Sequence, residues 1–169
     1  LTTSGFVTEN YEIWPHLSIC LCFFLFFIGA SAGSTTGGIK IVRTLLILKY
    51  IYFEIKRLIH PNVLYNIKIG KKNISEDIIK NTLGFYLFYI FIFVFFSIFI
   101  SFYNIDFLSA LSISASSIGN IGPGLGSIGP YDNWGHLPNA VKIISSFCML
   151  LGRLEIFTVM VLVSRIFFK

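Results

Sequence analysis

The chain has 169 residues, of which 55% are hydrophobic and only 12% are charged, and its formal net charge is +5. Soluble domains carry about 25% charged residues, and a chain this apolar has no means of hiding its surface from water. The composition therefore argues against a soluble globular protein and predicts an integral membrane protein.

The positive charges are distributed unevenly, and this predicts the topology. Nine of the thirteen Lys and Arg residues lie between Lys40 and Lys80, whereas none lies in residues 1–39 or 81–141. By the positive-inside rule, the basic segment faces the cytoplasm, and residues 1–14 and 103–138 face the outside. The same distribution argues against nucleic acid as the partner of the basic residues.

The first half of the chain predicts two helices separated by a break. Residues 13–39 carry no formal charge, and Trp14 and Pro15 stand where an interfacial aromatic and a first helical turn are expected. The sequence WPHLSICLCFFLFFIGA, residues 14–30, is therefore expected to form the first helix. The sequence GSTTGG, residues 33–38, is a poor helix former at membrane depth. A basic amphipathic helix is expected to follow over residues 39–59.

The second half predicts a long helix, a short helix, a loop and a final helix. Residues 81–105 are uncharged and as a helix would extend about 37 Å, enough to span a bilayer with some tilt. Asp106 is a candidate N-cap for residues 106–117, which are too short to cross. Residues 138–168 complete the pattern.

Residues 115–130, ASSIGNIGPGLGSIGP, are rich in glycine and carry no charge. Irregular backbone at membrane depth is tolerated only where it is buried in protein or lines water. A half-helix that leads into such a loop is typical of a cation filter, in which carbonyls replace the hydration shell of an ion. The alternative is an external glycine-rich loop that binds no ion.

An internal repeat favours the filter. The chain begins with TTSGFVTENYEIWPH, and IGNIGPGLGSIGPYDNWGH follows about 120 residues later. Each copy has an uncharged glycine turn, then a tyrosine, then a tryptophan near a histidine and a proline, and then a long apolar segment. One such loop cannot enclose an axis, but several related by symmetry can.

Four motifs, in the same order and at similar spacing, resemble the potassium-uptake membrane subunits of the TrkH/KtrB family: TTSGFVTENYEIWP, GASAGSTTGGIKIVR, IGNIGPGLG and GRLEIFTVMVL. The resemblance covers essentially the whole chain and is strongest to the TrkH branch. It implies an all-α integral membrane fold in which four helix–pore loop–helix units surround one pore with pseudo-fourfold symmetry.

This resemblance divides the chain into parts of two units. Residues 1–60 would be the end of the third unit, residues 61–77 a cytoplasmic link, and residues 78–169 the fourth unit. Within the fourth unit it implies an outer helix over 78–105, a pore half-helix over 106–117, a filter loop over 118–130 and an inner helix over 138–168. The first two units would be missing.

The resemblance also implies which residues select the ion, through K⁺ bound at backbone carbonyls. The third loop would supply Thr2, Thr3, Ser4, Gly5 and Phe6, and the fourth would supply Gly119, Asn120, Ile121, Gly122 and Pro123. Ser4 replaces a more usual threonine, and Gly119 stands where the family commonly has asparagine. Gly5 and Gly122 would be the central filter glycines.

A gate beneath the filter is also implied, because the GASAGSTTGGIK motif is similar to the intramembrane loop of the family. Its residues would be Gly33, Ser34, Thr35, Thr36, Gly37 and Gly38. Each glycine lowers helix stability by about 1 kcal/mol relative to alanine, and the hydroxyls offer competing hydrogen bonds. The alternative is a plain kink for helix packing, whereas the spacing does not match a phosphate-binding loop.

Arg153 and Glu155 lie near the middle of the last apolar segment, where charge is costly and by default functional. Two residues apart on a helix, they do not face each other. The resemblance places Arg153 in the pore below the filter as an electrostatic barrier, and the alternative is a structural ion pair with another helix. For Glu155 we expect a structural role.

The implied function is K⁺ uptake across the bacterial inner membrane by a multi-pass subunit with no enzymatic activity and no cofactor. The alternatives are a sodium-selective or weakly selective transporter of the same fold and a non-conducting truncated fragment. Implied partners are membrane lipid, a second copy in a homodimer, a cytosolic ring of nucleotide-binding subunits (TrkA/KtrA-like) and the missing N-terminal half. Lipid headgroups or that ring would contact the basic residues Lys40, Arg43, Lys49, Lys56 and Arg57.

Overall fold

The computed structural model of the chain describes residues 3–31, 33–34, 37–60, 67–69 and 72–154. The regular elements within these ranges are helices and one two-stranded hairpin. In chain order they are a 3₁₀ turn at Tyr11–Ile13, α1 (His16–Leu25), α2 (Ile41–Ile59), β1 (Lys68–Ile69), β2 (Lys72–Asn73), α3 (Glu76–Ser101), α4 (Phe107–Gly119), 3₁₀ turns at Gly126–Ile128 and Trp134–His136, and α5 (Asn139–Arg153).

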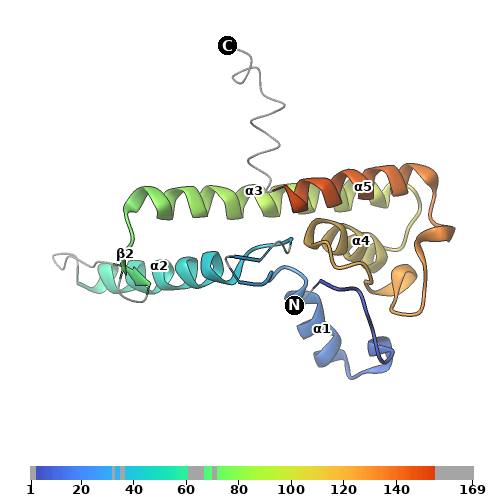
Figure 1. Cartoon of the computed structure of the whole chain (residues 1–169), viewed down its shortest axis with the longest axis horizontal. Coiled ribbons are helices and arrows are strands. Elements are labelled where there is room, and N and C mark those ends of the chain that lie inside the picture. Colours follow the sequence, from blue (N-terminus) through green and yellow to red (C-terminus); the bar gives the residue numbers. More distant parts are fainter. Residues whose placement is uncertain (1–2, 32, 35–36, 61–66, 70–71, 155–169) are drawn as a thin grey trace, which may run out of the picture.

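Helix α3 is the element against which α2, α4 and α5 pack. Figure 1 shows α2 along the first part of α3, and α4 and α5 along the remainder. With 26 residues, α3 is about 39 Å long. Among the described residues it is the one helix both long and apolar enough to cross a membrane, and its most apolar 18-residue window has a mean hydropathy of 2.5.

Three buried clusters follow one another along α3. The first joins α2, the hairpin region and the start of α3 through Leu46, Ile67 and Ile79. The middle and last clusters are Ile39, Phe85, Tyr89, Ile92, Ile118 and Cys148, and then Ile100, Ala110, Ile113, Ile128, Leu137 and Val141. The last two clusters enclose α4, so the structure buries the short helix between α3 and α5.

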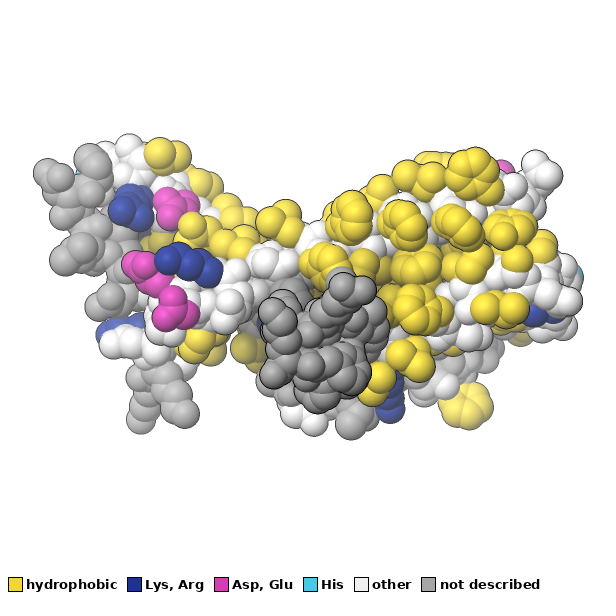
Figure 2. Space-filling view, turned by 90° about the horizontal axis from the view of Figure 1, so that it is seen from above, with side chains coloured by type: hydrophobic (Ala, Val, Ile, Leu, Met, Phe, Trp, Pro, Cys, Tyr) yellow, Lys and Arg dark blue, Asp and Glu magenta, His cyan; other side chains and the backbone are white. Residues whose placement is uncertain are grey.

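Large apolar side chains also cover an outer face of the molecule. Figure 2 shows a continuous hydrophobic surface at one end and charged side chains gathered at the other. Leu87, Phe91, Phe95, Ile98 and Phe102, all on α3 or its C-cap, are between 54% and 79% exposed. An apolar surface of this kind is suited to lipid or to further protein, not to water.

The first predicted helix is much shorter than expected. We expected helix from Trp14 to Ala30, but α1 ends at Leu25. The backbone then pairs with the segment before α2: the Gly29 amide donates to Ile39 O (2.8 Å) and the Ile39 amide donates to Phe27 O (3.0 Å). The prediction was wrong because this long-range pairing, closed by a parallel bridge between Ile28 and Ile39, competes with helix.

The other helices differ from prediction mainly at their ends. We expected 78–105, 106–117 and 138–168, and the structure has Glu76–Ser101, Phe107–Gly119 and Asn139–Arg153, with residues 155–169 outside the described part. The N-cap role of Asp106 is confirmed, because its carboxylate accepts from the Leu108 amide. Helix α3 ends early because Asn104 adopts a left-handed conformation, with a φ of 55°.

The hairpin was not expected within the link 61–77. Lys68 pairs with Asn73 and Ile69 with Lys72 in antiparallel register. Ile67 is buried against α2 and α3, and the Lys49 ammonium donates to Lys68 O (2.8 Å). The hairpin thus covers the first cluster beside the basic end of α2.

We expect Gly152→Ala to destabilise the protein. A β carbon at Gly152 would meet Ile118 O, a backbone atom that cannot rotate away, and would lie 2.8 Å from Asn120 Nδ2. Overpacking costs about 1–3 kcal/mol, more than the roughly 1 kcal/mol that alanine gains over glycine within a helix. The measurement is the apparent melting temperature of the detergent-solubilised protein.

The matched control is Gly33→Ala, because a β carbon at Gly33 meets nothing within 4 Å. Equal melting temperatures for the two variants would contradict the close packing of α4 on α5.

Candidate functional site

The site begins where α4 ends, at a left-handed residue. Asn120 has φ 54° and ψ 46°, and its amide donates to Ser117 O (3.2 Å) while the Ile121 amide donates to Ser116 O (3.0 Å). These two bonds form the Schellman ending of a helix, and asparagine tolerates the left-handed conformation better than most residues. The carboxyl end of α4, the negative end of its dipole, therefore leads directly into the glycine loop.

The two copies of the repeat share an alternation of backbone conformation. In the first copy Thr3 (49°) and Gly5 (74°) have positive φ, and in the second Asn120 (54°) and Gly122 (104°) do. The matched positions are thus the first and third residues of two four-residue stretches, Thr3–Phe6 and Asn120–Pro123, which are called the first and second tetrads below. When the sign of φ alternates in this way, successive carbonyls can point to the same side of the backbone. In an extended strand, successive carbonyls point to opposite sides.

This conformation is costly at Thr3. A β-branched residue with positive φ is unusual, and the left-handed region costs about 1–2 kcal/mol for most residues. Strain of this kind is found where function needs a particular backbone path. The alternation is therefore maintained by the surrounding structure and not by local preference.

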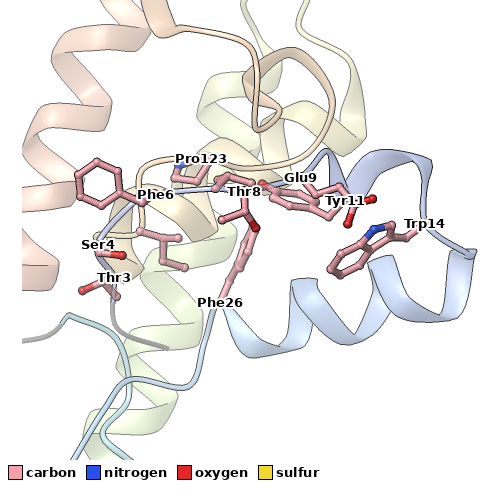
Figure 3. A pocket seen from close by; sticks show the side chains of 12 residues that line it. Thr3, Ser4, Phe6, Thr8, Glu9, Tyr11, Trp14, Phe26 and Pro123 are labelled. Atoms are coloured by element: carbon pink, nitrogen blue, oxygen red, sulfur yellow. The ribbon is translucent and has the colours of Figure 1, made fainter.

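The two tetrads lie directly against each other. A β carbon on Gly5 would lie 3.3 Å from Ile121 O, and one on Gly122 would lie 3.8 Å from the Gly5 Cα. Residues 3–9 line a cleft of about 260 Å³ together with Ile121 and Pro123. Figure 3 shows the Thr3 and Ser4 hydroxyls at one end of this cleft and the rings of Tyr11 and Trp14 at the other.

One face of α4 supplies hydroxyl groups to the returning loop. The Leu125 amide donates to Ser112 Oγ (2.5 Å) and the Ser127 amide donates to Ser109 Oγ (3.0 Å). Ser116 Oγ lies 3.0 Å from both Gly122 O and Pro123 O, to which it can donate. Ser109, Ser112 and Ser116, the serine face of α4, thus replace the backbone partners that an irregular buried loop lacks.

Two carbonyls of the expected filter loop accept hydrogen bonds from other groups of the protein. Gly122 O accepts from Trp134 Nε1 (3.2 Å) and from Ser116, and Pro123 O accepts from Ser116. The carbonyl of Ile121 instead faces the other loop at Gly5. Gly122 therefore contributes its positive φ to the turn of the loop. Its carbonyl is directed toward Ser116 on α4 and toward Trp134.

The residues between α1 and α2 reach the lower end of the filter loop. A β carbon on Gly37 would lie 2.8 Å from Gly119 O and 2.9 Å from Asn120 Nδ2. The expected gate loop thus touches the expected filter at Gly119 and Asn120. Gly33 and Ser34 lie in the described range 33–34 and Gly38 in the range 37–60, whereas Thr35 and Thr36, and also Thr2 of the expected filter, lie outside the described residues.

Helix α5 meets the same point from another side. The Asn120 side chain donates to Met149 O (3.0 Å), and Gly152 packs against Ile118 O. Arg153 follows as the last residue of α5, and its side chain is exposed. Arg153 therefore adjoins Gly152, the residue of α5 that packs against Ile118, and Glu155 lies outside the described part.

The basic residues of α2 are in part used within the molecule. The Arg43 guanidinium lies 4.2 Å from the centre of the Phe85 ring on α3, and Arg57 pairs with Glu54 at 3.8 Å. Lys49 donates to the hairpin, and the Lys56 ammonium lies 4.9 Å from the Tyr52 ring. Arg43 is thus a packing residue between α2 and α3 and less suited to contact with headgroups.

Sequence reasoning missed the residues that support the loop. The serine face was detectable from the spacing of Ser109, Ser112 and Ser116, which places them on one side of a helix. Tyr11 and Glu12 had no local signal. The Tyr11 hydroxyl donates to Gly124 O (2.5 Å) and Glu12 Oε1 accepts from the Gly126 amide (2.7 Å), across more than 110 residues.

Comparison with known proteins identifies the family. The model of the TrkH family, described as cation transport proteins, matches residues 1–167. The chain belongs to the TrkH family. It is 38% identical over 99% of its length to the Trk system potassium uptake protein TrkH of Escherichia coli K12, and 34% identical over its whole length to TrkI of Halomonas elongata.

A solved TrkH structure has the same fold. The crystal structure of the potassium transporter TrkH from Vibrio parahaemolyticus matches 99% of this chain with a TM-score of 0.89 and 37% identity. The chain covers 36% of that protein and 34–35% of the two relatives above. It therefore has the all-α fold of a membrane transporter and spans about a third of the length of its TrkH relatives.

We expect Ser112→Ala to destabilise the TrkH-like loop. Ser112 is fully buried, and its loss would leave the Leu125 amide without its acceptor, at a cost of about 1–3 kcal/mol. Ser146→Ala is the matched control. Ser146 is on α5 and is exposed, and its hydroxyl donates to Lys142 O (2.8 Å) on that helix and has no contact with the loop. Apparent melting temperatures decide, and an equal effect of both changes would refute the role of the serine face.

Proposed function

We propose that this chain forms part of the ion pathway of a potassium-uptake transporter and supplies two of its filter loops. The observation that carries this proposal is the shared alternation of positive φ at Thr3 and Gly5 and at Asn120 and Gly122, in loops that lie against each other. Backbone carbonyls aligned in this way replace the hydration shell of a monovalent cation without a charged side chain. The TrkH relatives are described as potassium uptake proteins.

The carbonyls of Thr3, Ser4, Asn120 and Ile121 are the proposed ion ligands. Gly122 and Pro123 support them, since their carbonyls accept from Trp134 and Ser116. Gly5 and Gly122 provide the positive φ, which a side chain would strain. Gly119 directly precedes the second tetrad, and Phe6, the last residue of the first tetrad, is almost fully exposed.

The segment 33–38 acts as the proposed gate under the filter, and Arg153 as the proposed barrier. Gly37 touches Gly119 and Asn120, while Arg153 follows Gly152, which packs at the same place. A fixed positive charge beneath the filter repels a cation that has left it. A movement of either segment would alter the other through Asn120.

The same proposal includes how the chain is divided into pore units and which partners complete the transporter. Residues 1–60 and 78–169 would be parts of the third and fourth of four pore units in a bacterial inner-membrane protein, with 61–77 in the cytoplasm. The remaining units would be supplied by the other two thirds found in the relatives. A second copy of the subunit and a TrkA/KtrA-like nucleotide-binding ring are the proposed protein partners.

Growth rescue tests the function. Residues 1–169 would replace the matching third of the Vibrio parahaemolyticus TrkH, and the chimaera would be expressed in a bacterium that lacks K⁺ uptake. We expect growth at micromolar K⁺, and K⁺ taken up in preference to Na⁺ in isotope assays. Uptake of Na⁺ without growth rescue would favour a sodium-selective relative. A chimaera that is present in the membrane but takes up no cation would contradict the proposal.

Gly122→Ser in this chimaera is expected to abolish selective K⁺ uptake. Serine is strained at a φ of 104°, and its side chain would be directed toward Gly5. Ser4→Thr is the matched control within the filter, because threonine keeps the hydroxyl and is the more usual residue of the family at this position. Unchanged uptake by Gly122→Ser, at equal abundance in the membrane, would remove the basis for the filter.

Arg153→Gln is expected to raise the rate of K⁺ uptake several-fold, because the barrier loses its charge while the length of the side chain is nearly kept. Arg153→Lys, which retains the charge, should transport at the rate of the unchanged chimaera. Initial rates of ⁸⁶Rb⁺ uptake into proteoliposomes measure the difference. Equal rates for the two variants would show that Arg153 has a structural role instead.

A further inference from the structure

We infer that Tyr11 and Glu12 act as positioning residues for the fourth filter loop, and that Glu12 holds this loop through hydrogen-bond geometry and not by attracting the ion. The inference rests on the proposed function, since it names what keeps one filter loop in register with its neighbour. The two residues, with their partners Gly124 and Gly126, are called the Tyr11–Glu12 clamp below.

The clamp connects the two halves of the chain at the filter. The Tyr11 hydroxyl donates to Gly124 O, and the Gly126 amide donates to Glu12 Oε1 at 2.7 Å. A β carbon on Gly129 would lie 2.8 Å from Glu12 Oε2, so the carboxylate is also packed against the far side of the same turn. Both contacts are partly buried, and a charge-assisted hydrogen bond of this length is among the stronger ones in proteins.

The side that presents the clamp is itself ordered. Asn10 caps the 3₁₀ turn by accepting from the Glu12 amide (3.0 Å), and the Trp14 amide donates to Tyr11 O (3.2 Å). The Tyr11 and Trp14 rings pack edge to face with centroids 6.4 Å apart. Burial, with the charge of Glu12 beside it, raises the pKa of Tyr11 to about 12, so the hydroxyl keeps its proton and donates at neutral pH.

The loop is held from two sides at once. The serine face of α4 accepts from the amides of Leu125 and Ser127, and the clamp bonds Gly124 O and the Gly126 amide, which alternate with them along the chain. Alternate residues are thus fixed by α4 and by the preceding pore unit. Gly122 and Pro123 precede this stretch directly, so a loosened clamp would let the filter backbone shift against the first tetrad.

Three substitutions separate geometry from charge, each made in the full-length chimaera described above. Glu12→Gln loses the charge but keeps an acceptor at the same reach, whereas Glu12→Asp keeps the charge and withdraws it by one methylene. Glu12→Ala removes both. Glu9→Gln is the matched control, because Glu9 is exposed and lines the same cleft.

The measurement is the ratio of K⁺ to Na⁺ uptake in proteoliposomes. We expect Glu12→Asp and Glu12→Ala to lower it about tenfold, as the loss of one partly buried hydrogen bond allows, and Glu12→Gln and Glu9→Gln to leave it nearly unchanged. Tyr11→Phe, which removes the other half of the clamp, should lower it as well. Loss of selectivity in Glu12→Gln with retention in Glu12→Asp would overturn the inference, and so would an unchanged ratio in all variants.

Hydrogen exchange of the peptide that contains residues 124–128 tests the clamp without transport. We expect slow exchange in the unchanged chimaera and in Glu12→Gln, and faster exchange in Glu12→Asp, Glu12→Ala and Tyr11→Phe. Slow exchange throughout would refute the clamp even if K⁺ is transported. The expected pattern in a chimaera that transports no K⁺ would support the clamp while the proposed function fails.

Discussion

The left-handed backbone of Asn120 is the constraint on which the centre of the molecule depends. It ends α4 and directs the chain away from the helix axis into the loop, and the side chain of the same residue donates through Nδ2 to Met149 O on α5. Its neighbours Ile118 and Gly119 contact Gly152 and Gly37 through their carbonyls. Four segments therefore meet at one turn of backbone: the filter loop, α4, α5 and the connection between α1 and α2. Because an asparagine adopts this conformation at low cost, the turn places little strain on the helix that precedes it.

The polar character of α4 follows from the loop that it supports. Ser109, Ser112, Ser114, Ser116 and Ser117 are almost fully buried, which is unusual for hydroxyl groups. Ser114 donates to Phe93 O on α3, and the serine face bonds the returning loop. A buried loop without regular structure needs partners for its amides and carbonyls, and hydroxyls provide them without introducing a charge. The glycine stretch can therefore remain uncharged and non-helical while it is packed between α4 and the segment before α1.

The local features of this arrangement were predictable from sequence, and the long-range ones were not. The N-cap of α4 at Asp106, its brevity and the loop that follows could be predicted, since each depends on neighbouring residues. The match between Thr3–Phe6 and Asn120–Pro123 rested on similarity, and the shared signs of φ agree with it. The early end of α1 depends on pairing between Phe27–Gly29 and Ile39, and Glu12 depends on Gly126, which no local pattern reveals. The link 61–77 contains alternating Ile67 and Ile69, a pattern that favours a strand such as β1 of the hairpin.

The placement of charge around the loops has a physical consequence for ion selection. A carboxylate that faced the pathway would attract any cation, and discrimination would then depend on a side chain free to move. Glu12 instead accepts from the Gly126 amide and packs on Gly129, so its carboxylate acts as a hydrogen-bond acceptor that fixes the backbone after the second tetrad. In the proposed pore the ion meets carbonyl dipoles whose positions are set by this contact and by the serine face. Discrimination between K⁺ and Na⁺ by carbonyls depends on whether the carbonyl oxygens can move inward to coordinate the smaller Na⁺. A loop that is held at alternate residues from two sides allows the least inward movement.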